Sequence, residues 1–278
     1  MTGDDSVGAS AQLPFRPRVA AASLSGESDA DWARNAAPHV GAAFLGGIAL
    51  DEPTREAARK LVARGRDEFL PTDPLAFLDE QLAVLADTPI LAGFNVRAAS
   101  PNPVREAARI CRDRGAILEV NAHCRQDEMC AAGAGESLLH DADRLCEQVR
   151  AAAETDAIVS VKVRTEVDGV DLPETAGRLA AAGAGLIHVD AMDSEPVIAE
   201  VVEAVGGDPA RGSPEGNRRP DGREAFVVAN NEVRDRASVR EYLEYGADAV
   251  SVGRPSDDPA TLELVREATE EWFAEVPV

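Results

Sequence analysis

The chain has 278 residues, of which 45% are hydrophobic and only 4% are aromatic. That length allows one large domain or two small ones, with a core filled mainly by Ala, Val, Leu and Ile. Residues 1–15 lack the basic start and apolar stretch of a signal peptide, and no apolar run approaches the ~20 residues of a membrane span. We therefore expect a cytoplasmic protein without a membrane partner.

Acidic residues dominate the charge of the chain. Asp and Glu number 50 against 28 Lys and Arg, which gives a formal net charge of −22. The charge is spread along the sequence, and this pattern is typical of the solvated acidic surface of halophilic proteins. At about 1 M salt the Debye length is roughly 3 Å, so self-repulsion is screened. No evident basic surface favours nucleic-acid binding.

Eight short apolar runs alternate with amphipathic helical patterns along the chain. In chain order the runs cover residues 18–24, 41–47, 89–97, 116–124, 158–165, 185–192, 225–231 and 248–255. This number of strands in a chain of this length predicts an α/β fold, a single (β/α)8 TIM barrel. A doubly wound open sheet is the main alternative, but no G-x-G-x-x-G motif follows the first run.

Three segments depart from this alternation. Residues 1–16 read as a disordered N-terminal tail, so we place the barrel domain at residues 17–278. Residues 51–88 are too long for one connection and predict an extra helix or a lid over the barrel mouth. Residues 206–224 are rich in Gly, Pro and charge, which predicts an inserted surface loop.

Lysine is almost absent from the sequence. Lys60 and Lys162 are the only two, among 28 basic residues. Lys60 lies in an exposed helical pattern and needs no special role. Lys162 lies inside the apolar run 158–165, where an ammonium group requires a partner or a function.

Cys124 ends the fourth apolar run, and three interpretations of it are open. As metal ligands, His123, Cys124 and Cys130 do not match the C-x-x-C spacing of structural zinc, so we expect no metal. Cys124 could also be a buried small residue, as Cys111 and Cys146 are expected to be on apolar helix faces. The third interpretation is a reacting thiol, which with an unperturbed pKa of about 8.5 stays mostly protonated and can act as an acid.

Polar residues gather at the carboxyl ends of the runs, where TIM barrels place their active sites. The loops after runs 225–231 and 248–255 occupy the positions at which barrels commonly bind phosphate. Backbone amides, Gly253 and Arg254 would hold such a group. An ordinary strand followed by a turn would have the same sequence pattern and is the alternative.

The stretch "EVNAHCRQDEMCAAGAGESLL" (119–139) resembles, without gaps, the dihydrouridine synthase segment in which Asn-x-Gly-Cys-Pro precedes a glycine-rich turn and two leucines. The segments "VKVR", "GAGLIHVDAM", "FVVANNEV" and "GADAVSVGR" follow in the order and spacing of that family. The resemblance covers roughly residues 17–275 and is nearest to a divergent archaeal branch, related to dihydroorotate and dihydropyrimidine dehydrogenases.

The resemblance implies FMN in the barrel mouth, reduced by NAD(P)H, and reduction of a uracil double bond. Cys124 would be the proton donor, and Lys162 would contact the flavin ring and ribityl region. Asn95 would take the place of a glutamine facing the flavin, and His188 would be a further cofactor contact. The remaining implied contacts are Asn230, Asn231, Gly253 and Arg254 for the phosphate, and Asn121 and Arg164 for the substrate.

The sequence also departs from the family pattern. His123 and Arg125 replace the glycine and proline around the cysteine, and Asn231 replaces a glycine. Asp190 stands where a flavin-contacting histidine is usual, with His188 two residues earlier on the same strand face.

The end of the chain bears on the substrate. Only one barrel helix is expected after the last strand, so we predict no C-terminal helical tRNA-binding domain. The substrate is therefore open between tRNA and a small free pyrimidine. A barrel that binds flavin or phosphate without turnover is the other open alternative.

Overall fold

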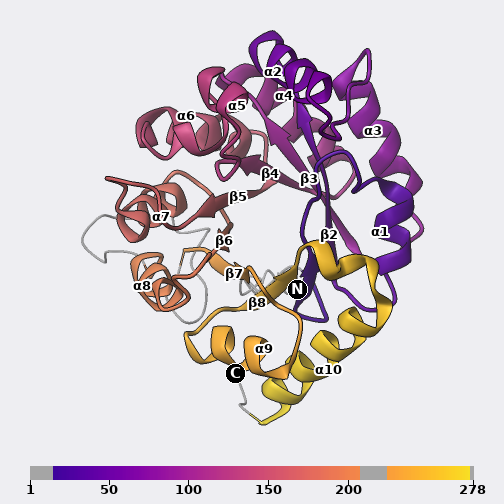
Figure 1. Cartoon of the computed structure of the whole chain (residues 1–278), viewed down its shortest axis with the longest axis vertical. Coiled ribbons are helices and arrows are strands. Elements are labelled where there is room, and N and C mark those ends of the chain that lie inside the picture. Colours follow the sequence, from indigo (N-terminus) through magenta and orange to yellow (C-terminus); the bar gives the residue numbers. More distant parts are fainter. Residues whose placement is uncertain (1–14, 207–223, 276–278) are drawn as a thin grey trace, which may run out of the picture.

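The computed structural model describes residues 15–206 and 224–275. Eight parallel strands, β1 to β8, form a closed barrel in sequence order, and the helices surround it (Figure 1). The predicted TIM barrel is therefore confirmed, and each strand overlaps its predicted run. The strands are β1 Val19–Ala21, β2 Ala42–Ala49, β3 Leu91–Arg97, β4 Ile117–Asn121, β5 Ile158–Arg164, β6 Leu186–Asp190, β7 Phe226–Asn230 and β8 Ala249–Val252.

Most of the helices begin at an aspartate. The Asp29, Asp51, Asp73, Asp141, Asp171 and Asp235 side chains each accept a hydrogen bond from a backbone N–H of the first turn, which satisfies an otherwise unpaired donor. The helices are α1 Ala30–Ala36, α2 Glu52–Ala63, α3 Pro74–Val84, α4 Pro101–Asp113, α5 Asp127–Ala131, α6 Ala142–Ala153, α7 Leu172–Ala181, α8 Val197–Ala204, α9 Arg236–Glu244 and α10 Pro259–Glu275, with 3-10 turns η1 Gly135–Leu138 and η2 Arg254–Asp257.

The strands alternate between an outer face packed on the helices and an inner face that fills the barrel. The lowest inner layer is apolar and includes Phe44, Ile117 and Leu186. Two residues further along the same strands the inner layer becomes polar, with Glu119 on β4 and His188 on β6. Because successive inward positions form layers in such barrels, the next polar layer reaches the mouth.

The long connection after β2 contains an extra helix, as predicted. Both α2 and α3 precede β3. Between them, Phe69 forms a parallel bridge with Ile48, and Glu68 pairs with Arg97 at the end of β3, with Arg97 Nη1 2.5 Å from Glu68 Oε2. This connection is therefore fixed against the carboxyl end of the barrel.

Two sequence expectations fall largely beyond the described residues. The predicted loop 206–224 is described only at Gly206 and Glu224, and the predicted tail 1–16 only at Phe15 and Arg16. Phe15 is buried and packs into the lowest layer of the barrel. Every helix within residues 15–206 and 224–275 is too short or too polar to cross a bilayer.

Candidate active site

A cavity of about 380 Å³ opens at the carboxyl ends of the strands. Five of the predicted site residues line it together: Lys162, Asn230, Asn231, Gly253 and Arg254. They come from β5 and from the segments at the ends of β7 and β8, which lie far apart in the sequence. The barrel closure brings them to one mouth, where this fold places its active sites.

Lys162 and Asp190 carry opposite charges into this cavity. The Lys162 side chain is buried, and its ammonium makes no hydrogen bond within the described residues. Burial lowers the pKa of Lys162, while the negative charges of Glu119 and Asp190 oppose that shift. Asp190 Oδ1 is also buried without a hydrogen-bond partner in the described part of the chain. A buried polar atom without a partner is costly, so the Asp190 oxygen, next to the cavity that Lys162 also lines, fits a bound polar molecule.

The segments after β7 and β8 form the other end of the cavity. Asn231 and Glu232 have φ values of 107° and 50°, a left-handed turn that carries the chain around the cavity. The Asn231 amide is fixed by a 2.8 Å bond to the Met192 carbonyl, and the Asn230 amide by a 3.0 Å bond to the Ser251 carbonyl. A Cβ added at Gly253 would meet no atom within 4 Å, so there is open space against its backbone.

Below the cavity lies a network of buried hydrogen bonds centred on Glu119. One carboxylate oxygen accepts from Asn95 Nδ2 at 2.7 Å. The other accepts from Ser160 Oγ at 3.1 Å and is 2.7 Å from His188 Nδ1. His188 Nε2 is in turn 2.7 Å from Ser251 Oγ. The network therefore joins strands on opposite sides of the barrel.

The charges of this network follow from its contacts. Burial raises the pKa of Glu119, but the bonded His188 ring and the Lys162 ammonium outweigh burial, so the pKa lies below its usual value. Burial lowers the pKa of His188, with Glu119 opposing that shift. A carboxylate can only accept, so a neutral His188 donates through Nδ1 and accepts the Ser251 hydroxyl at Nε2.

Cys124 lies in the loop after β4, next to His123, and is not among the residues that line the cavity. Its backbone N–H donates to Asn121 Oδ1 at 3.1 Å, and its side chain is partly buried against the apolar cluster of Ala57, Leu61, Met129 and Ala134. Its neighbour His123 lines the cavity. A Cβ on Gly135 would meet the Cys124 carbonyl oxygen at 2.2 Å, so the glycine-rich turn permits the close approach of this loop.

Two cations, Lys162 and Arg97, lie near this loop. Arg97 is buried at the end of β3 and also donates to Ser25. Burial lowers the pKa of Arg97, but an ionised Cys124 together with the Glu68 carboxylate would outweigh burial and raise it. Burial, together with the Lys162 and Arg97 charges, holds the pKa of His123 well below its usual value. His123 is therefore neutral near pH 7, and the loop faces fixed cations.

The other predicted site residues, Cys124 among them, do not line the cavity. Asn95 and His188 are fully buried in the network, and Asp190 lines the cavity above His188 on the same strand. Asn121 is buried and bonds Asn95 and Cys124. Arg164 is buried and pairs with Glu136 of η1 at 3.1 Å. The roles assigned to these residues remain predictions.

The sequence analysis did not identify Glu119, whose carboxylate contacts the side chains of Asn95, Ser160 and His188. A signal was present, because Glu119 is a carboxylate inside the apolar run 116–124. Glu119, like Lys162, is a charge inside a buried strand and therefore needs partners. Cys111 and Cys146 are buried on α4 and α6, as predicted.

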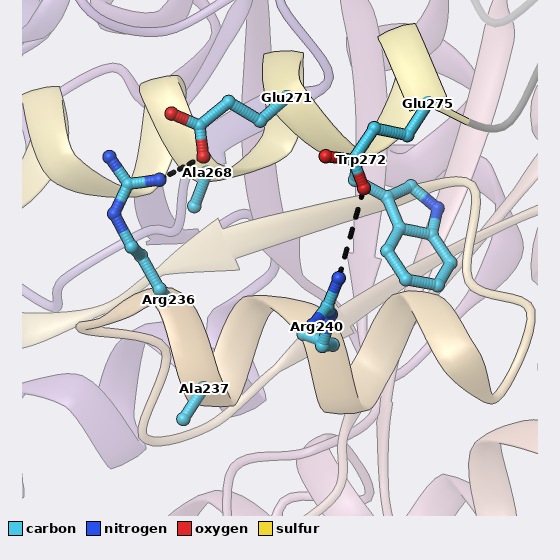
Figure 2. Close-up of a pocket in the computed structure, with 7 residues that line it drawn as sticks. All are labelled: Arg236, Ala237, Arg240, Ala268, Glu271, Trp272 and Glu275. Atoms are coloured by element: carbon cyan, nitrogen blue, oxygen red, sulfur yellow. Dashed lines mark hydrogen bonds and ion pairs between the residues drawn. The ribbon is translucent and has the colours of Figure 1, made fainter.

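A second cavity of about 380 Å³ lies on the outside of the barrel, between α9 and α10 (Figure 2). Its two arginines are paired with carboxylates: Arg236 with Glu271, and Arg240 with Glu275 at 3.9 Å. We assign it no function. Residues 15–206 and 224–275 contain no group of three or more His, Cys, Asp or Glu side chains arranged to hold a metal ion.

Known proteins resemble this chain in sequence and in fold. The dihydrouridine synthase family model matches residues 79–192, which confirms the resemblance over a range containing Asn95, Cys124 and Lys162. An uncharacterized protein of Methanocaldococcus jannaschii is 24% identical over 250 residues, covering 85% of this chain and 88% of that protein. The match to the family model supports an oxidoreductase of the dihydrouridine synthase type.

Two solved structures share the fold at low identity. DHODH from Eimeria tenella, in complex with ferulenol, has a TM-score of 0.65 and 12% identity, covering 93% of this chain and 81% of that one. An IMP dehydrogenase/GMP reductase-like protein from Corynebacterium glutamicum has a TM-score of 0.54 and 19% identity, covering 91% of this chain and 67% of that one. At these identities the likeness concerns the barrel fold alone.

Proposed function

We propose that this protein is an FMN-dependent oxidoreductase that reduces the double bond of a uracil ring, with the uridine of a tRNA as substrate. The observation that carries the proposal is the convergence of Lys162, Asp190, Gly253 and Arg254 on one cavity, beside the loop of Cys124. The family match over residues 79–192 supports the reaction type.

The residues lining the cavity fit FMN. Lys162 and the unpaired Asp190 oxygen offer a cation and an acceptor to the polar edge of the ring system. The open space at Gly253 and the exposed Arg254 guanidinium suit a phosphate, which binds well to backbone N–H groups and arginine. When bound, FMN supplies a hydride, which it regains from NAD(P)H as the external reductant.

The chain itself supplies position and a proton. Cys124 donates the thiol proton to one carbon of the uracil double bond as the hydride arrives at the other carbon. The resulting thiolate lies near the Arg97 guanidinium, which opposes its negative charge. Water then restores the thiol proton. The ring gains two electrons and two hydrogens, and NAD(P)H is the reductant consumed.

The remaining buried groups hold this arrangement. Asn121 fixes the Cys124 backbone, and Arg164 holds Glu136 in the turn that follows. In this proposal His188 and Asn95 act from below the cavity, through Glu119, and Asp190 takes the contact next to the cofactor. Fixing groups in a reactive geometry accounts for much of the rate gain of such enzymes.

The experiment is anaerobic reoxidation of the photoreduced, FMN-loaded protein in molar salt. Unmodified tRNA should restore the oxidised flavin spectrum and gain dihydrouridine, measured by mass spectrometry, and Cys124→Ala should slow this by roughly a hundredfold or more, the scale of general-acid catalysis. If free uracil or uridine reoxidises the flavin and tRNA does not, the substrate is a small pyrimidine and not tRNA. No reoxidation by either would refute the proposed reaction.

A further inference from the structure

The hydrogen bonds of the buried network below the cavity all run, from donor to acceptor, in one direction along each arm. In one arm, the Cys124 N–H donates to Asn121 Oδ1 at 3.1 Å, and Asn121 Nδ2 donates to Asn95 Oδ1 at 2.8 Å. Asn95 Nδ2 then donates to Glu119 Oε1 at 2.7 Å. Every donor in this arm points toward Glu119.

A second arm reaches the same carboxylate from the opposite side of the barrel. The Ser251 hydroxyl is 2.7 Å from His188 Nε2, and His188 Nδ1 is 2.7 Å from Glu119 Oε2. Glu119 cannot donate when ionised, so this arm also runs toward it. The Ser160 hydroxyl also donates to Glu119, and this bond does not extend the network to another side chain. The carboxylate is fully buried and is the common end of both arms.

We propose that Glu119 is a positioning residue for Cys124: as the terminal acceptor it fixes which way the Asn95 and Asn121 amides face, and so presents Asn121 Oδ1 to the Cys124 backbone. This inference rests on the proposed function, because the position of Cys124 matters for the reaction only if Cys124 is the proton donor. An amide has an oxygen and an NH2 that are nearly alike in shape. Only the hydrogen-bond network decides their orientation.

The two arms differ in whether they can reverse. The asparagine arm ends at a backbone N–H, which cannot become an acceptor. The histidine arm ends at the Ser251 hydroxyl, which rotates freely and has the Ala229 carbonyl 3.5 Å away as another acceptor. A residue at position 119 with one oxygen and one NH2 should therefore keep the asparagine arm and reverse the histidine arm.

The test measures the rate at which iodoacetamide alkylates Cys124 in flavin-free protein, with the modified peptide identified by mass spectrometry. Glu119→Met leaves Asn95 without its acceptor, and alkylation should become about fivefold faster, as expected from losing a bond of about 1 kcal/mol. Glu119→Gln should stay within about twofold of wild type, while nitrogen NMR shows the His188 proton moved from Nδ1 to Nε2. Ser160→Ala, the matched control, should also stay near wild type.

Two results would overturn the proposal: an unchanged alkylation rate in Glu119→Met, or an equally fast rate in Glu119→Gln with His188 unaltered. If Glu119→Met does not fold, Asn95→Ala serves instead, since it removes the link between Glu119 and Asn121 and must give the same faster alkylation. The assay needs neither flavin nor substrate. A protein that lacks the proposed activity can therefore still confirm or refute the role of Glu119.

Discussion

Asn121 and Lys162 lie directly opposite one another, paired in register between β4 and β5. Asn121 holds the backbone of Cys124, and Lys162 lines the cavity. The thiol loop and the buried ammonium are therefore anchored at the same level of two neighbouring strands. In the proposed reaction, this pairing would keep the loop of the proton donor at the level of the bound ring.

Lys162→Met should weaken FMN binding by roughly 10- to 100-fold, because a hydrogen bond to a charged group contributes about 1.5–3 kcal/mol. The measurement is a fluorescence titration of FMN in molar salt. Lys60→Met is the matched control, since Lys60 is exposed on α2, with its ammonium 3.9 Å from Glu56. Equal affinities for FMN in the two variants would remove Lys162 from the cofactor site.

Arg254→Ala should weaken the binding of FMN about tenfold and leave the binding of riboflavin unchanged, because only FMN carries the phosphate. The two ligands are titrated against the same variant. Arg240→Ala, a change to an exposed arginine on the outer surface between α9 and α10, should alter neither affinity. An equal loss for both ligands would place Arg254 elsewhere than at the phosphate.

The barrel fold could be predicted from the sequence because the apolar runs and the helix boundaries that define it are local patterns repeated along the chain. Each apolar run became a strand, and an Asp cap before a helix, as at Asp51 and Asp73, marks a boundary through its own hydrogen bonds. The ends of β7 and β8 were placed together correctly, since the fold alone brings Asn230 and Gly253 to the same mouth.

The layering inside the barrel was less accessible. Whether an inward residue lines the cavity or lies below it depends on its height in the barrel, which strand stagger sets and composition does not. His188 and Asp190 share a strand face, yet only Asp190 lines the cavity. Asn95, for which the resemblance implies a place facing the flavin, does not line the cavity and is bonded to Glu119.

Gly135→Ala should reduce turnover far more than Gly115→Ala does. Both glycines have a φ near +65°, so the backbone strain of about 1–2 kcal/mol is common to both substitutions. Only at Gly135 would the new Cβ meet the Cys124 carbonyl oxygen, at 2.2 Å; at Gly115 it would meet nothing within 4 Å. Urea denaturation and turnover are measured on both variants. Equal turnover would show that the turn at Gly135 does not position Cys124.

Stability should fall as the pH is lowered from 7 to 5. The pKa values of His123 and His188 lie below the usual 6.5 in the folded state. The unfolded chain therefore binds more protons below that pH, and each histidine costs up to about 1.4 kcal/mol per pH unit. Carboxylates with lowered pKa values, such as Glu119, add their loss only near and below pH 4.5.

The melting temperature at fixed salt, followed from pH 7.5 to 5, measures this effect. His123→Asn should flatten the profile in that range. A wild-type melting temperature that stays constant over the range would mean that both histidines protonate as freely in the folded protein as in the unfolded chain.

The most direct test of the central claim is the visible spectrum of the protein mixed with FMN in molar salt and then freed of unbound ligand. A flavin cofactor held at Lys162, Asp190 and Arg254 predicts a yellow protein with about one FMN per chain, and Lys162→Met should retain much less. A wild-type protein that emerges colourless would contradict the account.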